Sequence, residues 1–192
     1  MNKIQLPFTG ERCVPEHMSG QIKTYQHHMA RYNFALMYAR NKRVLDAACG
    51  SGFGTNLLYD VASLICGVDI SKEAYAYAQE RYNGTFVVCD LNKYIPAGPF
   101  DIVISFETIE HLDDPNKFIE NVIKVSNAFL FSIPINDPSK FHKTVYSVYE
   151  IKNLFGKYFD HVDWFSQRGL NITKGINEKS KYLIGYATIG KE

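Results

Sequence analysis

Five short apolar runs lie in the middle of this chain, and helical or turn-forming segments separate each run from the next. The runs are predicted strands at residues 43–47, 64–68, 85–89, 101–106 and 128–133. Strands that are almost continuous in apolar residues, with helices between them, are typical of a parallel sheet buried on both faces. The pattern predicts a doubly wound α/β fold with a mostly parallel sheet, in which ligands bind at the carboxyl ends of the strands.

Local signals mark the helices of this fold. Ser71 is a predicted N-cap, Pro115 suits the first position of a helix, and Ser147 with Glu150 matches a capping box. Apolar residues at steps of three or four predict another helix near the N-terminus. The predicted helices cover residues 21–40, 72–81, 114–125 and 148–155.

Both ends of the chain are expected to complete this core. Residues 162–165 and 182–188 are predicted strands of a C-terminal antiparallel hairpin, and the polar stretch between them, about 167–181, is expected to be a mobile loop. The first twenty residues contain several Gly and Pro residues, which indicates a loop. Together with the helix that follows, this arm is expected to form an N-terminal lid over the site.

Length and composition fit one globular domain. The 192 residues are 46% hydrophobic and 21% charged, within the globular range. We expect a single domain over residues 1–192, with an arm and helix over 1–40 and a Rossmann-like core over 41–192. The 21 basic and 20 acidic residues leave a net charge of +1, which does not favour capture of nucleic acid or an anionic membrane.

The cysteines and the apolar content suggest a cytoplasmic protein. Cys13, Cys49, Cys66 and Cys89 form no C-x-x-C pair, as expected for reduced thiols. The N-terminal residues show no signal peptide. No run of 18 apolar residues occurs, so we expect no membrane span.

A glycine loop follows the first predicted strand. Gly50 and Gly52 lack side chains, so a ligand is expected to lie against the backbone there. Such a loop also occurs in dinucleotide-binding folds and in simple tight turns. Asp46 lies just before the loop and would place an anion near the pyrophosphate of NAD, and the third glycine comes one position early for that cofactor.

Acidic residues lie at three successive strand ends. Asp69 follows Gly50 by 19 residues, a position from which a carboxylate can accept hydrogen bonds from both ribose hydroxyls. Asp90 ends the next predicted strand, within reach of an adenine amino group. With Asp46, this set favours a nucleoside ligand with a cationic sulfonium and an amino-acid tail.

These segments, 43–55 and 100–105 with Asp69 and Asp90, resemble those of the class I S-adenosylmethionine-dependent methyltransferases. The resemblance implies S-adenosylmethionine as the cofactor. It also implies that Gly50 and Gly52 face the methionine part and that Asp69 holds the ribose. The implied neighbours of the adenine and of the rest of the cofactor are Ile70, Asp90, Leu91 and Phe106.

The sequence resembles one branch of these methyltransferases more closely. Residues 9–12, 14–15, 31–35, 106–112, 141–142 and 167–168 resemble small methyltransferases of bacterial polysaccharide gene clusters. Arg31 can pair with the cofactor carboxylate, since arginine suits carboxylates, although a surface salt bridge is an equal alternative.

A second constellation concerns the acceptor. Glu107, Glu110 and His111 stand at i, i+3 and i+4, so a helical backbone would place them on one face. His142 follows the fifth strand, on the same rim. Two carboxylates and two imidazoles can bind one Mg²⁺, Mn²⁺ or Zn²⁺ ion. Alternatively, His111 packs under the cofactor and Glu107 caps a turn.

Resemblance extends to these residues as well. Glu107, Glu110, His111 and His142 look like the metal-binding set of the small-RNA 3′-end 2′-O-methyltransferases, and the first three resemble a motif of ubiquinone-pathway O-methyltransferases. We predict that His142, His111 and Glu107 act in catalysis, with His142 as base or metal ligand.

The leading hypothesis is O-methylation of a sugar, a nucleotide sugar or a cell-surface glycan intermediate by a small enzyme without a separate substrate domain. One alternative is a metal-dependent RNA ribose 2′-O-methyltransferase, against which the neutral charge argues. Two others are a dehydrogenase and a non-catalytic cofactor-binding partner protein.

Overall fold

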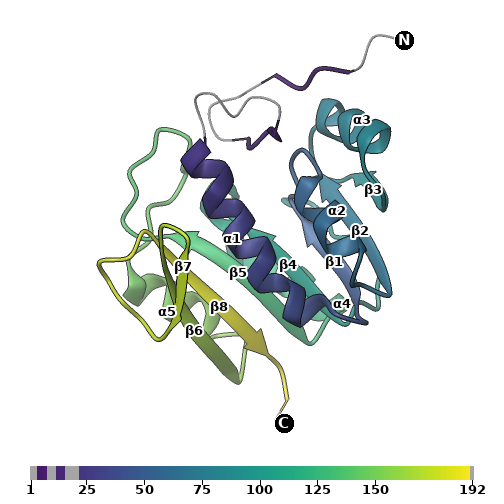
Figure 1. The fold of residues 1–192 in the computed structure, drawn as a ribbon. Helices are drawn as coiled ribbons and strands as arrows, with labels where there is room; N and C mark the ends of the chain where they lie inside the picture. Colours follow the sequence, from purple (N-terminus) through teal and green to yellow (C-terminus); the bar gives the residue numbers. More distant parts are fainter. Residues whose placement is uncertain (1–3, 8–11, 16–21, 191–192) are drawn as a thin grey trace.

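The computed structural model describes residues 4–7, 12–15 and 22–190. Its centre is one mixed sheet in the order β3-β2-β1-β4-β5-β8-β6-β7 (Figure 1). The strands are β1 Arg43–Ala47, β2 Leu64–Asp69, β3 Thr85–Val88, β4 Ile102–Phe106, β5 Ala128–Pro134, β6 His161–Arg168, β7 Asn171–Lys174 and β8 Tyr182–Thr188. The helices are α1 Ile22–Ala39, α2 Phe53–Tyr59, α3 Lys72–Arg81, α4 Pro115–Val125 and α5 Val148–Phe155, with the 3-10 helix η2 Ile109–His111.

The first five strands form the parallel part of the sheet that the apolar runs predict. β1 pairs in parallel with β2 and β4, β2 with β3, and β4 with β5. Strand order reverses between β1 and β4, and a crevice at such a switch point is where open α/β sheets bind ligands. The predicted Rossmann-like class is confirmed.

The predicted helix starts are confirmed by their capping bonds. Ser71 Oγ accepts from the Ala74 backbone at 3.1 Å. Ser147 and Glu150 make both bonds of a capping box. Each bond satisfies a backbone N–H that has no partner within the helix.

Helices pack on both faces of the sheet. On one face, α4 and α5 bury Phe118 and Phe155 against β5, where Phe131 stacks on Phe155 with ring centroids 3.6 Å apart. On the other face, α1 and α2 bury Tyr32 and Leu58. Continuous apolar strands are therefore explained by burial on two faces.

The prediction for residues 167–181 was wrong. β7, Asn171–Lys174, lies in that stretch and pairs with β6, so three antiparallel strands close the sheet instead of a two-strand hairpin. Gly169, at φ 62°, turns the chain between β6 and β7. β7 is a short edge strand with mostly exposed side chains, so no apolar run marks it in the sequence.

Of the predicted N-terminal lid, the helix is α1, whereas the arm of residues 1–20 lies mostly outside the described residues. Of the arm, Leu6 and Val14 are buried against Ala74 and Tyr77 of α3. Ser51 Oγ in the glycine loop donates to the Cys13 carbonyl at 2.7 Å. These contacts hold the described parts of the arm beside the glycine loop.

Gly54, in the first turn of α2, offers a test of this packing. A Cβ there would overlap the ring of Tyr32, which cannot turn away without losing its bond to Asp46. We expect Gly54→Ala to destabilise the protein by about 2 kcal/mol, because overpacking outweighs the gain of about 1 kcal/mol in helix propensity. Urea denaturation measures the change. In a Tyr32→Ala background the same substitution should be neutral or stabilising, and equal losses in both backgrounds would contradict the explanation.

Candidate cofactor and acceptor site

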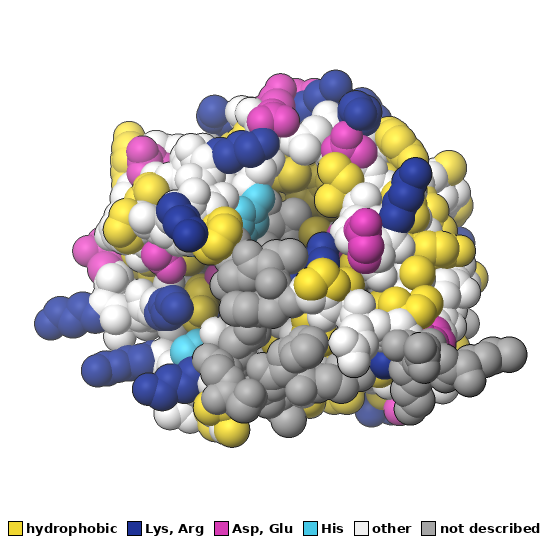
Figure 2. All heavy atoms as spheres, turned by 90° about the horizontal axis from the view of Figure 1, so that it is seen from above, with side chains coloured by type: hydrophobic (Ala, Val, Ile, Leu, Met, Phe, Trp, Pro, Cys, Tyr) yellow, Lys and Arg dark blue, Asp and Glu magenta, His cyan; other side chains and the backbone are white. Residues whose placement is uncertain are grey.

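Two adjoining hollows lie at the carboxyl edge of the parallel strands. Their volumes are about 470 and 300 Å³, and both are within the range of ligand sites. Figure 2 looks down on this edge and shows the hollowed centre with a histidine beside it. Ala48, Asp69, Glu107 and His111 line both hollows, so one extended ligand can occupy the two.

The two predicted glycines serve different purposes. Gly50 lines the larger hollow at φ 57°, and a Cβ there would point into open space. Gly52, at φ 84°, would place a Cβ 2.7 Å from Ala78 Cβ and 2.8 Å from the Phe86 ring. The structure therefore leaves Gly50 as the glycine beside which a ligand can lie, whereas Gly52 permits α2 to pack near α3 and β3.

Asp69 lines both hollows, and two backbone N–H groups fix the position of its carboxylate. Its Oδ2 accepts from Gly50 N at 3.0 Å, and its Oδ1 accepts from Ser71 N at 2.9 Å. A carboxylate has about four lone-pair sites, so both oxygens can still accept hydrogen bonds from a diol. This is the arrangement that the ribose prediction requires.

The smaller hollow contains the residues predicted for adenine. Ile70, Asp90 and Leu91 all line it. Lys93 Nζ lies 3.0 Å from Asp90 Oδ2, and hydrogen bonding to Lys93 is the main reason why the pKa of Asp90 is lowered. Asp90 is therefore an ionised acceptor at the rim.

Asp46 was predicted to bind the cofactor, but it is fully buried and lines neither hollow. Its carboxylate accepts from Thr55 Oγ1 at 2.6 Å and from Tyr32 Oη at 3.1 Å. Burial raises its pKa to about 6, against the lowering effect of these two hydrogen bonds. Asp46 thus positions Tyr32, which lines the larger hollow.

Arg31 is also buried, which rules out the surface salt bridge that was one alternative. Nη1 donates to Gln167 Oε1 at 2.9 Å, and the guanidinium lies 4.4 Å from the ring centroid of Tyr182. Nε and Nη2 have no hydrogen-bond partner among the described residues. Arg31 lines neither hollow, although Tyr182 and Phe106 beside it line the larger one.

Phe106 ends β4 and Glu107 follows it, and both line the larger hollow. Phe106 is buried edge-on against Tyr32, with centroids 5.2 Å apart. Glu107 has a φ of 54°, a left-handed conformation that is uncommon outside glycine. Its Oε1 accepts from Ser132 Oγ at 2.6 Å. This turn keeps Glu107 off the short helix η2, so the expected common helix face of Glu107, Glu110 and His111 does not form.

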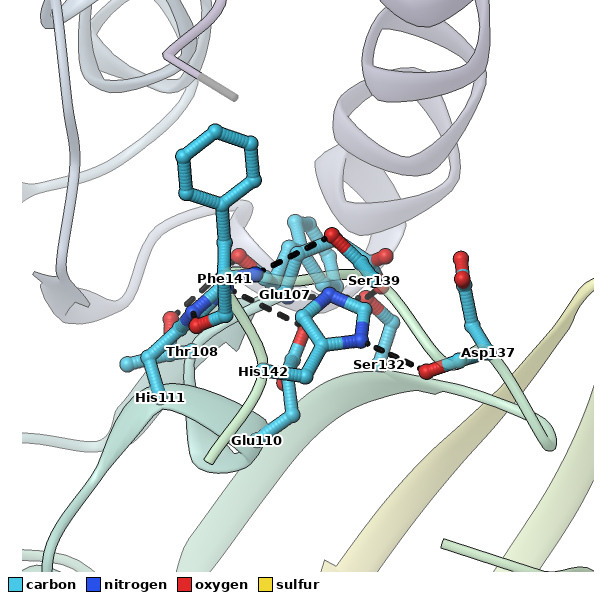
Figure 3. A network of polar contacts seen from close by, with 10 residues as sticks. Glu107, Thr108, Glu110, His111, Ser132, Asp137, Ser139, Phe141 and His142 are labelled. Atoms are coloured by element: carbon cyan, nitrogen blue, oxygen red, sulfur yellow. Dashed lines mark hydrogen bonds and ion pairs between the residues drawn. The ribbon is translucent and has the colours of Figure 1, made fainter. Parts of the chain in front are cut away.

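Glu110, His111 and His142 come together, as Figure 3 shows. Their ligand atoms all lie within 4.8 Å of one another, and Glu107 is outside this group. His111 Nδ1 lies 3.0 Å from the Phe141 carbonyl, and His142 Nδ1 lies 2.9 Å from the Asp137 carbonyl. A carbonyl only accepts, so each Nδ1 donates the hydrogen bond, and Nε2 is the ring nitrogen that each histidine presents as a base or ligand.

Several residues at the site were not singled out from the sequence. Lining residues of this kind are Thr24, Asp137, Ser139, Lys181 and Tyr182. They come from loops, α1 and β8, far from the glycine motif, and no short motif marks them. His28 of α1 also lines the larger hollow.

Comparisons with known proteins point to one class. Residues 45–128 match the model of a family described as a methyltransferase domain. A probable S-adenosylmethionine-dependent methyltransferase of Mycolicibacterium smegmatis is 30% identical over 138 residues, 67% of this chain and 52% of that protein. A ubiquinone biosynthesis O-methyltransferase of Coxiella burnetii is 30% identical over 102 residues, 48% of this chain and 44% of that protein. The chain spans about half the length of this Mycolicibacterium smegmatis protein and of two probable S-adenosylmethionine-dependent methyltransferases of Mycobacterium tuberculosis that it also matches.

A solved structure agrees with the sequence match. An S-adenosylmethionine-dependent methyltransferase from Clostridium acetobutylicum superimposes with a TM-score of 0.73 at 12% identity, covering 92% of this chain and 97% of that one. The chain therefore has the class I S-adenosylmethionine-dependent methyltransferase fold and contains a methyltransferase domain. Among the described residues, no helix is both long and apolar enough to cross a membrane.

The raised pKa of Asp46 predicts a pH dependence of stability. An acid whose pKa is about 6 when folded, against 3.8 ordinarily, binds its proton more tightly in the folded state. Between pH 4 and pH 6, this group should therefore remove about 3 kcal/mol of stability as the pH rises. Asp46→Asn should lack that loss, as urea denaturation at several pH values would show. Asp60→Asn, at the exposed C-cap of α2, is the control. Parallel pH profiles for wild type and Asp46→Asn would contradict the assignment.

Proposed function

We propose that this chain transfers the methyl group of S-adenosylmethionine to a hydroxyl oxygen of a sugar, a nucleotide sugar or a related glycan intermediate. The observation behind the hydroxyl acceptor is the group of Glu110, His111 and His142 at the wall of the larger hollow. An alcohol must lose its proton on methylation, and this group offers two imidazole Nε2 atoms and a carboxylate for that purpose.

The two hollows fit the cofactor. The smaller hollow suits an adenine, with Leu91 and Ile70 as apolar walls and Asp90 at the rim. Asp69 would accept the ribose hydroxyls at the junction, and the methionine part would extend past Gly50 into the larger hollow. The cofactor supplies an activated methyl group on a sulfonium, so the chain's own task is alignment and proton removal.

The cofactor carboxylate needs a cation, and the structure offers Arg12 more directly than Arg31. Arg12 lines the larger hollow, as Gly50 and Ser51 do, and the carbonyl of the next residue, Cys13, accepts from Ser51 Oγ. Arg31 lies against Tyr182 and reaches no lining position. We therefore assign the carboxylate to Arg12 and give Arg31 a supporting electrostatic role.

The same three residues also fit a divalent cation. One carboxylate and two imidazoles, each with Nδ1 held by a backbone carbonyl, form the donor set and outer shell that are typical of bound metals. Glu110, His111 and His142 would hold Mg²⁺, Mn²⁺ or Zn²⁺, and the ion would lower the pKa of a bound hydroxyl. Glu107, fixed by Ser132, would remain a nearby carboxylate beside the reacting atoms.

A sugar-like acceptor is supported by two features. The larger hollow is lined by hydroxyl, carboxylate and ammonium residues, which can form hydrogen bonds with the many hydroxyls of a sugar. These residues are Thr24, Ser139, Asp137 and Lys181. Motifs such as 106–112 and 141–142 resemble those of small methyltransferases from polysaccharide gene clusters. The relative from Coxiella burnetii is named an O-methyltransferase, in agreement with an oxygen acceptor.

Transfer of labelled methyl from S-adenosylmethionine tests this function. Two acceptor pools are offered, one of nucleotide sugars and soluble glycans and one of small RNA, each with and without a chelator. Label in the sugar pool is expected. Label only in nuclease-digestible material would replace the proposal with RNA ribose methylation. Cofactor binding without label in any pool would favour a non-catalytic partner protein.

His142→Ala tests the role of the histidine cluster. We expect at least a 100-fold loss of methyl transfer, since general acid–base catalysis contributes roughly 10²–10⁴-fold, with binding of S-adenosylhomocysteine unchanged. Calorimetric titration with Mn²⁺ gives a readout that does not depend on turnover, and the variant should lose the wild-type binding. The control is His161→Ala, since His161 lies on β6 away from the hollows. Unchanged turnover in His142→Ala would contradict the assignment.

A further inference from the structure

One wall of the larger hollow is basic, and its lining lysine, Lys181, is used neither by the cofactor assignment nor by the histidine cluster. This wall is formed by α1 and the start of β8. Lys181 and Tyr182 line the larger hollow but not the smaller one, so they lie on the side away from the predicted adenine position.

Two cations flank the ring of Tyr182 in this wall. Lys181 Nζ lies 5.1 Å from the ring centroid, and the guanidinium carbon of Arg31 lies 4.4 Å from it. The backbone of Lys181 is fixed on both sides, because its N–H donates to Gln167 O at 3.2 Å and its carbonyl accepts from Ile135 N at 2.9 Å. The ammonium group is therefore presented from a rigid strand end.

The positive charge of this wall is not neutralised by ion pairing within the described structure. Arg31 is fully buried, and its Nε and Nη2 have no hydrogen-bond partner among the described residues. No described carboxylate forms an ion pair with Arg31 or Lys181. A buried cation without a counterion is costly, so an anion that arrives with a ligand would be favoured here.

The positive charge of this wall also affects the pKa values of two histidines on α1, His27 and His28. Burial is the first cause of the lowered pKa of His27 and His28, and the charges of Arg31 and Lys181 lower both further. The Lys181 pKa is raised overall: burial lowers it, while Tyr182, Asp137 and Glu107 raise it, so the ammonium remains charged. Figure 2 shows further basic side chains gathered at one side of this face, and Lys174 and Lys179 are exposed in the neighbouring β7–β8 region.

We propose that Lys181, beside Tyr182 at the wall of the larger hollow, binds an anionic group of the methyl acceptor, and that the charge of the buried Arg31 against the Tyr182 ring adds to the attraction. This inference rests on the proposed function and narrows its substrate class to acidic sugars, either a sugar phosphate or a sugar carboxylate. Asp137 connects the wall to the reaction centre, because it lines the larger hollow and its carbonyl accepts a hydrogen bond from His142 Nδ1. An anion at Lys181 would thus orient a hydroxyl of the same molecule toward His142.

Three matched probes test this wall: glucose 1-phosphate, glucuronate and neutral glucose. Each is titrated calorimetrically, at constant ionic strength, into protein saturated with S-adenosylhomocysteine. At least one of the charged probes should bind ten or more times tighter than glucose. Binding of glucose 1-phosphate alone would identify a phosphate, and binding of glucuronate alone a carboxylate.

Lys181→Gln should abolish the preference for the charged probe and leave S-adenosylhomocysteine affinity within twofold. Lys179→Gln, an exposed lysine two residues away, should keep the preference. The proposal is overturned if neither charged probe is preferred, if Lys181→Gln retains the preference, or if Lys179→Gln loses it equally. It is also overturned if Lys181→Gln weakens S-adenosylhomocysteine instead, because the wall would then hold the cofactor carboxylate. Failure of wild-type protein to bind S-adenosylhomocysteine would count against the proposed function and not against the wall.

Discussion

The buried carboxylate of Asp46 is the interaction on which the geometry of the site depends. It lies in β1 and accepts hydrogen bonds from Tyr32 of α1 and Thr55 of α2, so one group joins the central strand to two helices. The glycine loop lies between Asp46 and Thr55, so the hydrogen bond between these two side chains restrains the conformation of the loop. Burial of the carboxylate costs stability, as its raised pKa shows, and the hydrogen bonds from Thr55 and Tyr32 offset part of that cost. The hydrogen bond from Tyr32 also fixes that side chain at the wall of the larger hollow.

Left-handed residues at strand ends direct the chain around the same edge. Ala48 follows β1, Glu107 follows β4 and Asn136 lies just after β5, with φ values of 64°, 54° and 51°. Such conformations are unfavourable for residues other than glycine and persist where the surroundings enforce them. At Glu107 the enforcing contacts are the bonds to Ser132. The turns therefore place acidic and backbone groups at the hollow.

Much of the fold was predictable because local patterns and burial agree. The five parallel strands match the apolar runs to within about two residues, and the caps at Ser71 and Ser147 start their helices as predicted. Asp69, Asp90 and His142 were placed correctly at the rim, because parallel strands end at one edge. Strand β7 was missed because its exposed edge position leaves no apolar signal.

The other differences from the sequence-based expectations concern the directions of side chains. Asp46 and Arg31 occupy motif positions from which they were expected to reach the cofactor, yet both point into the protein. Their partners, Tyr32 and Gln167, depend on how α1 packs across the sheet, which no local pattern specifies. Lys181 was not considered for the same reason, because its position at the hollow follows from the antiparallel pairing of β8 between β5 and β6.

The two walls of the larger hollow have opposite charge, and this difference bears on the order of events under the proposed function. Asp69 and Glu107 are acidic groups that line both hollows along the path assigned to the cofactor, and they attract a sulfonium. Methyl transfer converts the sulfonium to a neutral thioether, so that attraction is lost on turnover. The basic wall at Lys181 is unaffected by the change in the cofactor and would still hold an anionic product. Electrostatics alone thus predict that the reaction itself weakens the binding of the demethylated cofactor. The cations of the α1 and β8 wall, in contrast, continue to attract the methylated product and slow its release.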